Sequence, residues 1–227
     1  MGIFRGPNIV TDGLVLSLDA GSTRSYPGGG SSWKNLTGLT PDLTILGSPS
    51  HEILSGATCF NLDSDGDHFS ASNITTLTNS TQRTLEAWIH PASSELTSGD
   101  RGTVILMQGG SGNYMSWNKG NTRLSNYWYN KSPAGYHESG PANTRGQWHH
   151  WCSVWTGSEL KQWVDGVKYT VTPVTGTSTQ NTGINIGRES GGRQFSGGIA
   201  VIRVYNNLLS DDQVLQNYNA QKKRFGH

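Results

Sequence analysis

The sequence predicts an all-β protein in which two antiparallel sheets form a sandwich, followed by one short C-terminal helix. Three observations support this fold class. The chain of 227 residues contains 30 glycines and only 15% charged residues, which suits many short strands joined by tight turns. Several runs alternate apolar and polar residues, the pattern of a strand with one buried face. Clear helix-start signals stand near residue 210.

The first predicted strands lie in the N-terminal half of the chain. A turn at residues 10–13 leads into a strand over 14–19, and residues 59–62 form another. A stronger strand covers 84–91, where alternate residues divide between two faces. These two sets are Leu85, Ala87 and Ile89 against Glu86, Trp88 and His90.

A hairpin is predicted in the second half of the chain. Residues 160–164 and 167–171 are strand-like and are separated by Asp165 and Gly166. Asp-Gly is a strong two-residue hairpin signal, because both residues tolerate a positive φ. Residues 147–155 precede this hairpin as a further strand.

Two strands close the predicted sheets. Residues 183–186 alternate, and a loop rich in Gly and charge follows over 188–194. Residues 199–205 are apolar on both faces, which predicts a central strand covered from both directions. The alternation assigns the two faces to Ala200, Ile202 and Val204 on one side and Ile199, Val201 and Tyr205 on the other.

The C-terminal helix is predicted over residues 210–223. Ser210 is the expected N-cap, and Gln213 completes a capping box with it. Leu209 and Val214 have the spacing of a hydrophobic staple. The buried face is expected to carry Val214, Leu215 and Tyr218.

Charge and composition exclude several classes of partner. The net charge of +1 gives no electrostatic basis for binding nucleic acid or an anionic membrane surface. No apolar run approaches membrane-spanning length. The first residues lack the apolar core of a signal peptide, so we expect a protein made and kept in a cytoplasm, or assembled into a larger structure there. Cys59 and Cys152 are expected to be buried free thiols, bridged only if their strands are neighbours.

Two blocks of the chain resemble a known family. The first block comprises Ile186-Gly-Arg188, Phe195, Gly197, Ile199, 202–206 and 209–210. It resembles the C-terminal signature of laminin-G-like jelly rolls in the concanavalin A-like lectin superfamily. This resemblance implies a jelly-roll topology for the sandwich. Residues 11–38 and 217–226 resemble the two ends of laminin-G-like structural proteins of tailed bacteriophages, notably cyanophages. Residues 1–227 are therefore expected to be one domain, with a short N-terminal arm over 1–12.

The sequence contains no set of residues typical of an enzyme of this fold. Glucanases that share it carry Glu-x-Asp-x-x-Glu on one strand, whereas Glu86 stands alone on its strand. His149 and His150 are adjacent on a strand and point to opposite faces, so they cannot bind one ion together. No Gly-x-Ser-x-Gly elbow is present. The expected function is therefore not enzymatic.

Two groups of residues are candidates for binding. Asp63, Asp65 and Asp67 alternate around a glycine turn and suit a calcium ion, with Asp19 as a further ligand. The alternative is an acidic turn with solvated side chains. An aromatic group is the candidate for a glycan or a protein partner, although alternation also allows any member to be core. It comprises Tyr114, Trp117, Tyr127, Trp128, Tyr129 and Tyr136.

The resemblance to phage proteins implies a non-enzymatic virion structural protein. It would be a decoration or fibre-type subunit, assembled in the host cytoplasm, that self-associates or docks on capsid or tail proteins. The alternative is a carbohydrate-binding adhesion module that recognises host surface glycan. A glycan depolymerase is a third hypothesis.

Overall fold

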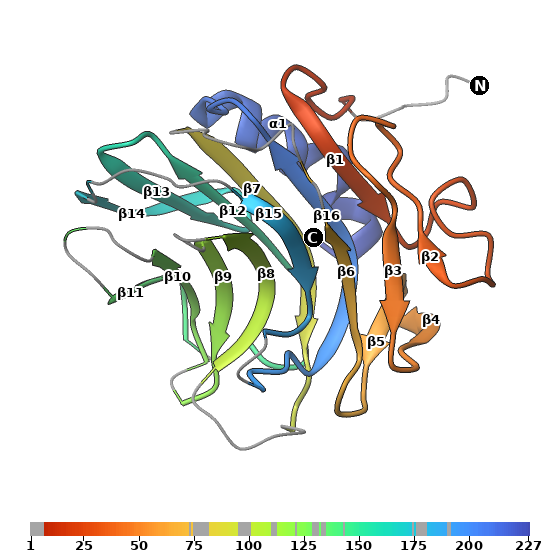
Figure 1. The fold of residues 1–227 in the computed structure, drawn as a ribbon. Helices are drawn as coiled ribbons and strands as arrows, with labels where there is room; N and C mark the ends of the chain where they lie inside the picture. The colour runs from red at the N-terminus through yellow and green to blue at the C-terminus, as the bar shows by residue number, and fades with distance from the viewer. Residues whose placement is uncertain are drawn as a thin grey trace, which may run out of the picture.

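Two antiparallel sheets of eight strands each form a sandwich in the computed structural model (Figure 1). The structure describes residues 7–72, 74, 82–94, 101–109, 113–120, 122–128, 132, 135–142, 144–173, 175, 181–189 and 192–227. The predicted all-β sandwich with a short C-terminal helix is confirmed. No helix in these ranges has the length and apolar character needed to cross a bilayer.

Sheet A runs in the order β14-β13-β12-β7-β16-β5-β4, and β1 also pairs with β16. Its strands are β1 (Leu14–Asp19), β4 (Ser50–Leu54), β5 (Ala57–Leu62), β7 (Arg83–Pro91), β12 (His149–Trp155), β13 (Glu159–Val164), β14 (Val167–Pro173) and β16 (Gly197–Tyr205). The predicted Asp165-Gly166 hairpin joins β13 and β14, and both turn residues have positive φ.

Sheet B runs in the order β11-β10-β9-β8-β15-β6-β3-β2. Its strands are β2 (Ser32–Trp33), β3 (Leu43–Leu46), β6 (His68–Ser72), β8 (Arg101–Gly109), β9 (Asn113–Asn118), β10 (Leu124–Trp128), β11 (Gly135–Ser139) and β15 (Asn181–Ile186). The inner faces of the two sheets enclose one large apolar core. Within it the rings of Trp33, Phe60 and Phe69 pack with centroids 4.8–4.9 Å apart.

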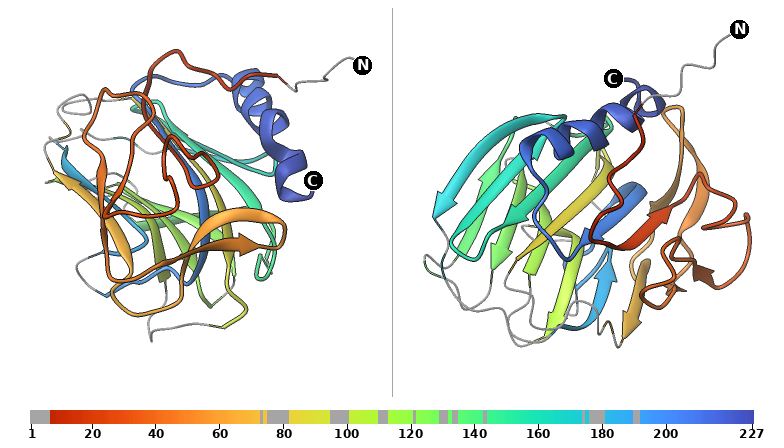
Figure 2. Two further views of the ribbon diagram at one scale, coloured as in Figure 1. Left: turned by 90° about the vertical axis from the view of Figure 1, so that its right-hand side faces the viewer. Right: turned by 90° about the horizontal axis from the view of Figure 1, so that it is seen from above.

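Helix α1 (Asp211–Gln221) and the 3-10 helix η2 (Lys222–Phe225) cover the outer face of sheet A (Figure 2). The predicted capping box is present, because Ser210 Oγ accepts from Gln213 N and Gln213 Oε1 accepts from Ser210 N. Val214 is buried as predicted, but Leu215 is 44% exposed, so its predicted place on the buried face is wrong. Asn217 is buried instead, one helical turn after Val214.

Asn217 joins the helix to sheet A through a buried polar network around Glu86 of β7. Glu86 Oε1 accepts from Arg203 Nη1 at 2.6 Å and from His150 Nε2 at 3.1 Å. Its Oε2 accepts from Asn217 Nδ2 at 2.7 Å, and the Tyr205 hydroxyl lies 3.5 Å away. Burial alone would raise the pKa of Glu86, but the Arg203 charge and the His150 and Asn217 hydrogen bonds lower it to about 2. A buried, charged hydrogen-bond network around Glu86 therefore joins the outer face of sheet A to helix α1.

Strand β16 is covered on both sides, as predicted, but two of its residues face opposite to the prediction. The register of β16 against β7 shifts between Ile199 and Val201. Ile199 consequently lies in the core between the sheets, whereas Ala200 and Val201 both lie in the cluster beneath the C-terminal helices. A β-bulge places two consecutive residues on one side, and simple alternation cannot anticipate it.

The C-terminal residues pack in the apolar cluster beneath the C-terminal helices. The Phe225 ring stacks on Trp88 with centroids 4.0 Å apart, and Tyr218 lies parallel to the same indole at 5.9 Å. Cys59 and Cys152 are both buried and unpaired, which confirms the predicted free thiols.

Candidate functional site on the outer face of sheet B

The outer face of sheet B carries no helix in the described part of the chain, in contrast to sheet A (Figure 2). Its strands turn alternate residues outward, because the intervening ones lie in the core. Polar and aromatic side chains gather on this face in two groups. One stands over β8–β11 and the other over β6 and β15.

The first group is centred on a tyrosine pair, Tyr127 of β10 and Tyr136 of β11. These residues are directly opposite in the ladder, and their ring centroids are 4.5 Å apart. The guanidinium carbon of Arg101 lies 3.6 Å from the centroid of Tyr136. Both tyrosines are half-buried. Such a pair presents a rigid aromatic surface, since each ring has few torsions to fix on binding.

Charged and hydroxyl groups hold the tyrosine pair in place. Arg101 Nη1 donates to Ser125 Oγ at 3.0 Å and pairs with Glu138 Oε1, which is 3.3 Å from Arg101 Nη2. The same carboxylate oxygen accepts from Asn118 Nδ2. Cation–π contact and ion pairing therefore fix Arg101 between the aromatic group and the carboxylate.

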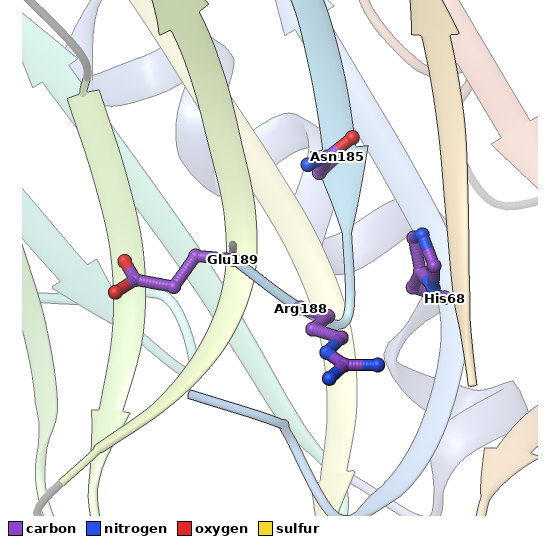
Figure 3. A pocket seen from close by; sticks show the side chains of 4 residues that line it. All are labelled: His68, Asn185, Arg188 and Glu189. Carbon is purple, nitrogen blue, oxygen red and sulfur yellow. The ribbon is translucent and has the colours of Figure 1, made fainter. Parts of the chain in front are cut away.

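The second group lines a hollow of about 290 Å³. The lining residues are His68 of β6, Asn185 of β15, and Arg188 and Glu189 from the segment after β15. In Figure 3, Asn185 and Arg188 lie between Glu189 on one side and His68 on the other. Asn185 and Glu189 are only 9% and 6% exposed. Glu189 Oε1 accepts from Arg193 Nη1 at 2.6 Å, which fixes the carboxylate.

The predicted aromatic group divides in the structure. Tyr127 and Tyr136 come together at the surface, and Tyr114 of β9 is opposite Tyr127 in the ladder. Trp117 is fully buried, and its Nε1 donates to Thr144 Oγ1 at 2.7 Å, so Trp117 belongs to the core. Trp128 belongs to β10. Tyr129 and the side chains of Tyr114 and Trp128 lie outside the described residues.

The predicted calcium ligands have other partners in the structure. Both carboxylate oxygens of Asp19 bind Arg224 Nη1 at 2.8 Å. Asp67 is fully buried and accepts from the backbone amides of Ser48 and Ser64. Asp63 and Asp65 are exposed, and Asp65 lies 3.8 Å from Arg188. The described residues contain no group of three or more His, Cys, Asp or Glu that could hold a metal ion.

The adjacent histidines have separate structural roles. His150 binds Glu86 in the network beneath α1, whereas His149 Nδ1 lies 2.7 Å from Asp165 Oδ2 at the hairpin turn. Asp165 Oδ1 also accepts from the His150 backbone amide at 2.8 Å. Each imidazole is thus held by a different carboxylate.

Sequence reasoning did not identify Arg101, Glu138, Asn185 or Glu189 as residues of the candidate site. The available signal was the alternation of Ile184 and Ile186, which places Asn185 on the opposite face of its strand. The other residues come from distant parts of the chain. Only the order of the strands brings them to one surface.

Comparison with known proteins supports the fold. Residues 63–215, more than half of the chain, match the Laminin_G_3 model of the concanavalin A-like lectin/glucanases superfamily. No match was found among curated protein sequences.

Several solved structures are similar. Domain 4 of AbnA, a GH43 extracellular arabinanase from Geobacillus stearothermophilus in complex with arabinotriose, aligns with a TM-score of 0.65 and 17% identity. The match covers 90% of this chain and 98% of that one. The Trypanosoma rangeli sialidase aligns with a TM-score of 0.69 and 15% identity. The match covers 95% of this chain and 34% of the sialidase. The receptor-binding domain of botulinum neurotoxin C/D mosaic serotype aligns with a TM-score of 0.68 and 14% identity. The match covers 92% of this chain and 51% of that one. At these identities the likeness concerns the fold.

Proposed function

The chain belongs to the concanavalin A-like lectin/glucanase superfamily, and from this membership we propose that it is a non-enzymatic module that binds carbohydrate on the outer face of sheet B. The observation that carries the proposal is the Tyr127–Tyr136 pair, fixed by Arg101 on a face without a covering helix in the described chain. The apolar CH face of a sugar ring stacks on such rings, while neighbouring polar groups bind its hydroxyls.

The similar structures support a carbohydrate ligand. One is a domain of an arabinanase in complex with arabinotriose, and another is a sialidase. The chain spans about a third of the sialidase and about half of the toxin domain.

The carboxylates on this face support binding rather than hydrolysis. A glycosidase needs two carboxyl groups roughly 5–10 Å apart across the scissile bond. Glu138 belongs to β11 and Glu189 follows β15, and three strands separate β11 from β15. Glu189 is held in an ion pair, because Arg193 Nη1 lies 2.6 Å from its Oε1. Glu138 is also paired with Arg101.

The resemblance of residues 11–38 and 217–226 to phage structural proteins supports display of this module on a tailed-phage particle. In that setting the glycan would belong to the host surface. Capsid or tail proteins, or further copies of the chain, would anchor the module on the virion. Calcium at Asp63, Asp65 and Asp67 stays a prediction, in which the ion would have to replace the amide hydrogen bonds of Asp67.

A panel of defined neutral and acidic oligosaccharides tests the binding proposal. We expect at least one class to bind the purified protein, and Tyr127→Ala or Tyr136→Ala to weaken that binding about tenfold or more, since truncating a tyrosine that anchors a ligand typically has an effect of this size. Tyr169→Ala, which removes a tyrosine 44% exposed on β14 of sheet A, is the matched control. Equal binding by all three variants would refute the proposed surface.

Co-sedimentation tests whether the module binds the host envelope or the phage particle. Labelled protein is mixed either with host envelope or with phage particles stripped of surface proteins, with and without a calcium chelator. Binding to envelope supports adhesion, and binding to particles supports a virion anchor. Binding to neither would refute the proposed setting.

A further inference from the structure

We propose that the hollow lined by His68, Asn185, Arg188 and Glu189 binds hydroxyl groups of the same oligosaccharide that stacks on Tyr127 and Tyr136. This inference rests on the proposed carbohydrate-binding function and assigns it a second subsite. It identifies the ligand as a polyhydroxylated chain several units long (Figure 3).

Two buried acceptors in the hollow lack partners. Asn185 Oδ1 and Glu189 Oε2 are inaccessible to solvent and have no hydrogen-bond partner among the described residues. Both residues line the hollow. A buried acceptor without a partner is unfavourable, and native proteins leave few of them. A ligand that donates one hydrogen bond to each of these two atoms would satisfy both.

The remaining lining residues narrow the chemistry of that ligand. Arg188 is a permanent donor and cation, and the imidazole of His68 can donate or accept. Its Nδ1 already lies 2.7 Å from the Gly66 carbonyl oxygen, so Nε2 is the atom available to a ligand. A hydroxyl group donates to one partner and accepts from another, so hydroxyl groups of the ligand can use Asn185 and Glu189 as acceptors and Arg188 as donor.

The charges of the hollow argue against simple ions. A cation at the two acceptors would lie beside Arg188 in the same hollow, and Arg193 is bound to Glu189. An anion would meet the buried Glu189 carboxylate, which is 6% exposed. Neutral hydroxyl groups avoid both repulsions.

The distance between the two subsites sets the length of the ligand. Asn185 lies on β15, and the path to Tyr127 and Tyr136 crosses β8 and β9 to β10 and β11. Three to four strand spacings correspond to about 15–20 Å. This is longer than one sugar ring, so a ligand that uses both subsites is an oligosaccharide lying across the strands.

The test compares two substitutions in the hollow with a matched control. Glu189→Gln replaces the unpartnered acceptor by a donor at nearly constant shape, and Asn185→Ala removes the other acceptor. Glu159→Gln makes the same change at a half-exposed pair with Lys161 on β13 of sheet A. Binding of the neutral oligosaccharides of the panel, from one to six units, is measured by calorimetry. Thermal unfolding and ¹H–¹⁵N spectra check that each variant is folded.

We expect Glu189→Gln and Asn185→Ala each to weaken binding about tenfold, and Glu159→Gln to leave it unchanged. Wild-type affinity should rise with chain length until both subsites are filled. In the wild-type spectrum, the longer oligosaccharides should shift the Asn185 side-chain amide together with the backbone amides of Tyr127 and Tyr136.

Three outcomes would overturn the inference. If both hollow variants bind like the wild type while Tyr127→Ala loses binding, the hollow is not a subsite and the proposed function stands. If calcium chloride alone shifts the Asn185 amide and the oligosaccharides bind only with calcium, the hollow is a cation site. If the wild type binds no oligosaccharide of the panel, the proposed function fails and this inference fails with it.

Discussion

Glu86→Gln is the substitution that most directly tests the buried network under helix α1. All four neighbours of the carboxylate approach it with donor groups: Arg203 and His150 at Oε1, and Asn217 and the Tyr205 hydroxyl at Oε2. A glutamine side chain has nearly the same shape, but its NH2 group is a donor and would face either the two donors at Oε1 or the two donors at Oε2. It also leaves the Arg203 guanidinium, 2% exposed, without a counter-charge.

The expected cost follows from that geometry. Removing one partner of a buried ion pair costs about 3–5 kcal/mol, because the other charge stays desolvated. The pKa of Glu86 gives a consistent figure. A carboxyl lowered from its ordinary value of 4.5 to about 2 stabilises the folded state by about 3 kcal/mol at neutral pH. We therefore expect Glu86→Gln to lower the free energy of unfolding by about 3–5 kcal/mol at pH 7.

Urea unfolding followed by tryptophan fluorescence measures this difference as a function of pH. The folded-state pKa of Glu86 lies below the unfolded one, so its stabilisation is fully present above the unfolded value. It is lost as the pH falls through the folded value. The difference between wild type and variant should therefore shrink between about pH 4.5 and pH 2.

Glu159→Gln is the control, because Glu159 is half-exposed and its Lys161 partner is 3.9 Å away. We expect it to change the stability by less than about 1 kcal/mol. A loss below about 1 kcal/mol for Glu86→Gln, or a difference that stays constant down to pH 2, would refute the proposed role of the network.

Two further predictions concern backbone and thiol chemistry. Gly197 has a φ of +125°, and a Cβ there would lie 2.2 Å from the His90 carbonyl oxygen. Gly197→Ala should therefore lower the free energy of unfolding, measured in urea, by at least about 2 kcal/mol more than the control Gly28→Ala. At Gly28 φ is +96° and the surrounding space is open. Equal losses of stability in the two variants would contradict this prediction. Burial, followed by the Glu52 charge, raises the pKa of Cys59 to about 12, and burial raises that of Cys152 well above its ordinary value. Both thiols should resist Ellman's reagent at pH 8 until the protein unfolds, and rapid labelling of the native protein would be the contrary result.

The periodic parts of the sequence were predicted well, because local physics alone determines them. Ser210 and Gln213 form the capping box, and the Asp165-Gly166 turn joins two strands. The faces of β7 also follow the alternation, with Leu85, Ala87 and Ile89 in the core. The errors occurred where tertiary contacts override periodicity. The bulge in β16 turns Ala200 outward.

Leu215 shows the same limit. It is apolar and follows Val214, but the helix buries Asn217 because the Glu86 carboxylate below it needs a donor. A hydrophobic pattern cannot anticipate a buried amide whose partner lies 131 residues away in the chain. The same reason explains why Asn217 was not predicted to anchor the helix.

The sequence by itself determined the fold class, the helix and its cap, the buried thiols and the tyrosines of the candidate surface. These features depend on neighbours within a few residues, where spacing and side-chain type are sufficient. Only the tertiary structure decided which side chains share a site. Arg101, Tyr136 and Asn185 meet on one face because sheet B orders its strands as β11-β10-β9-β8-β15-β6. That order depends on pairings between strands far apart in the chain, such as β15 with β6 and β8, and no local window of sequence contains it.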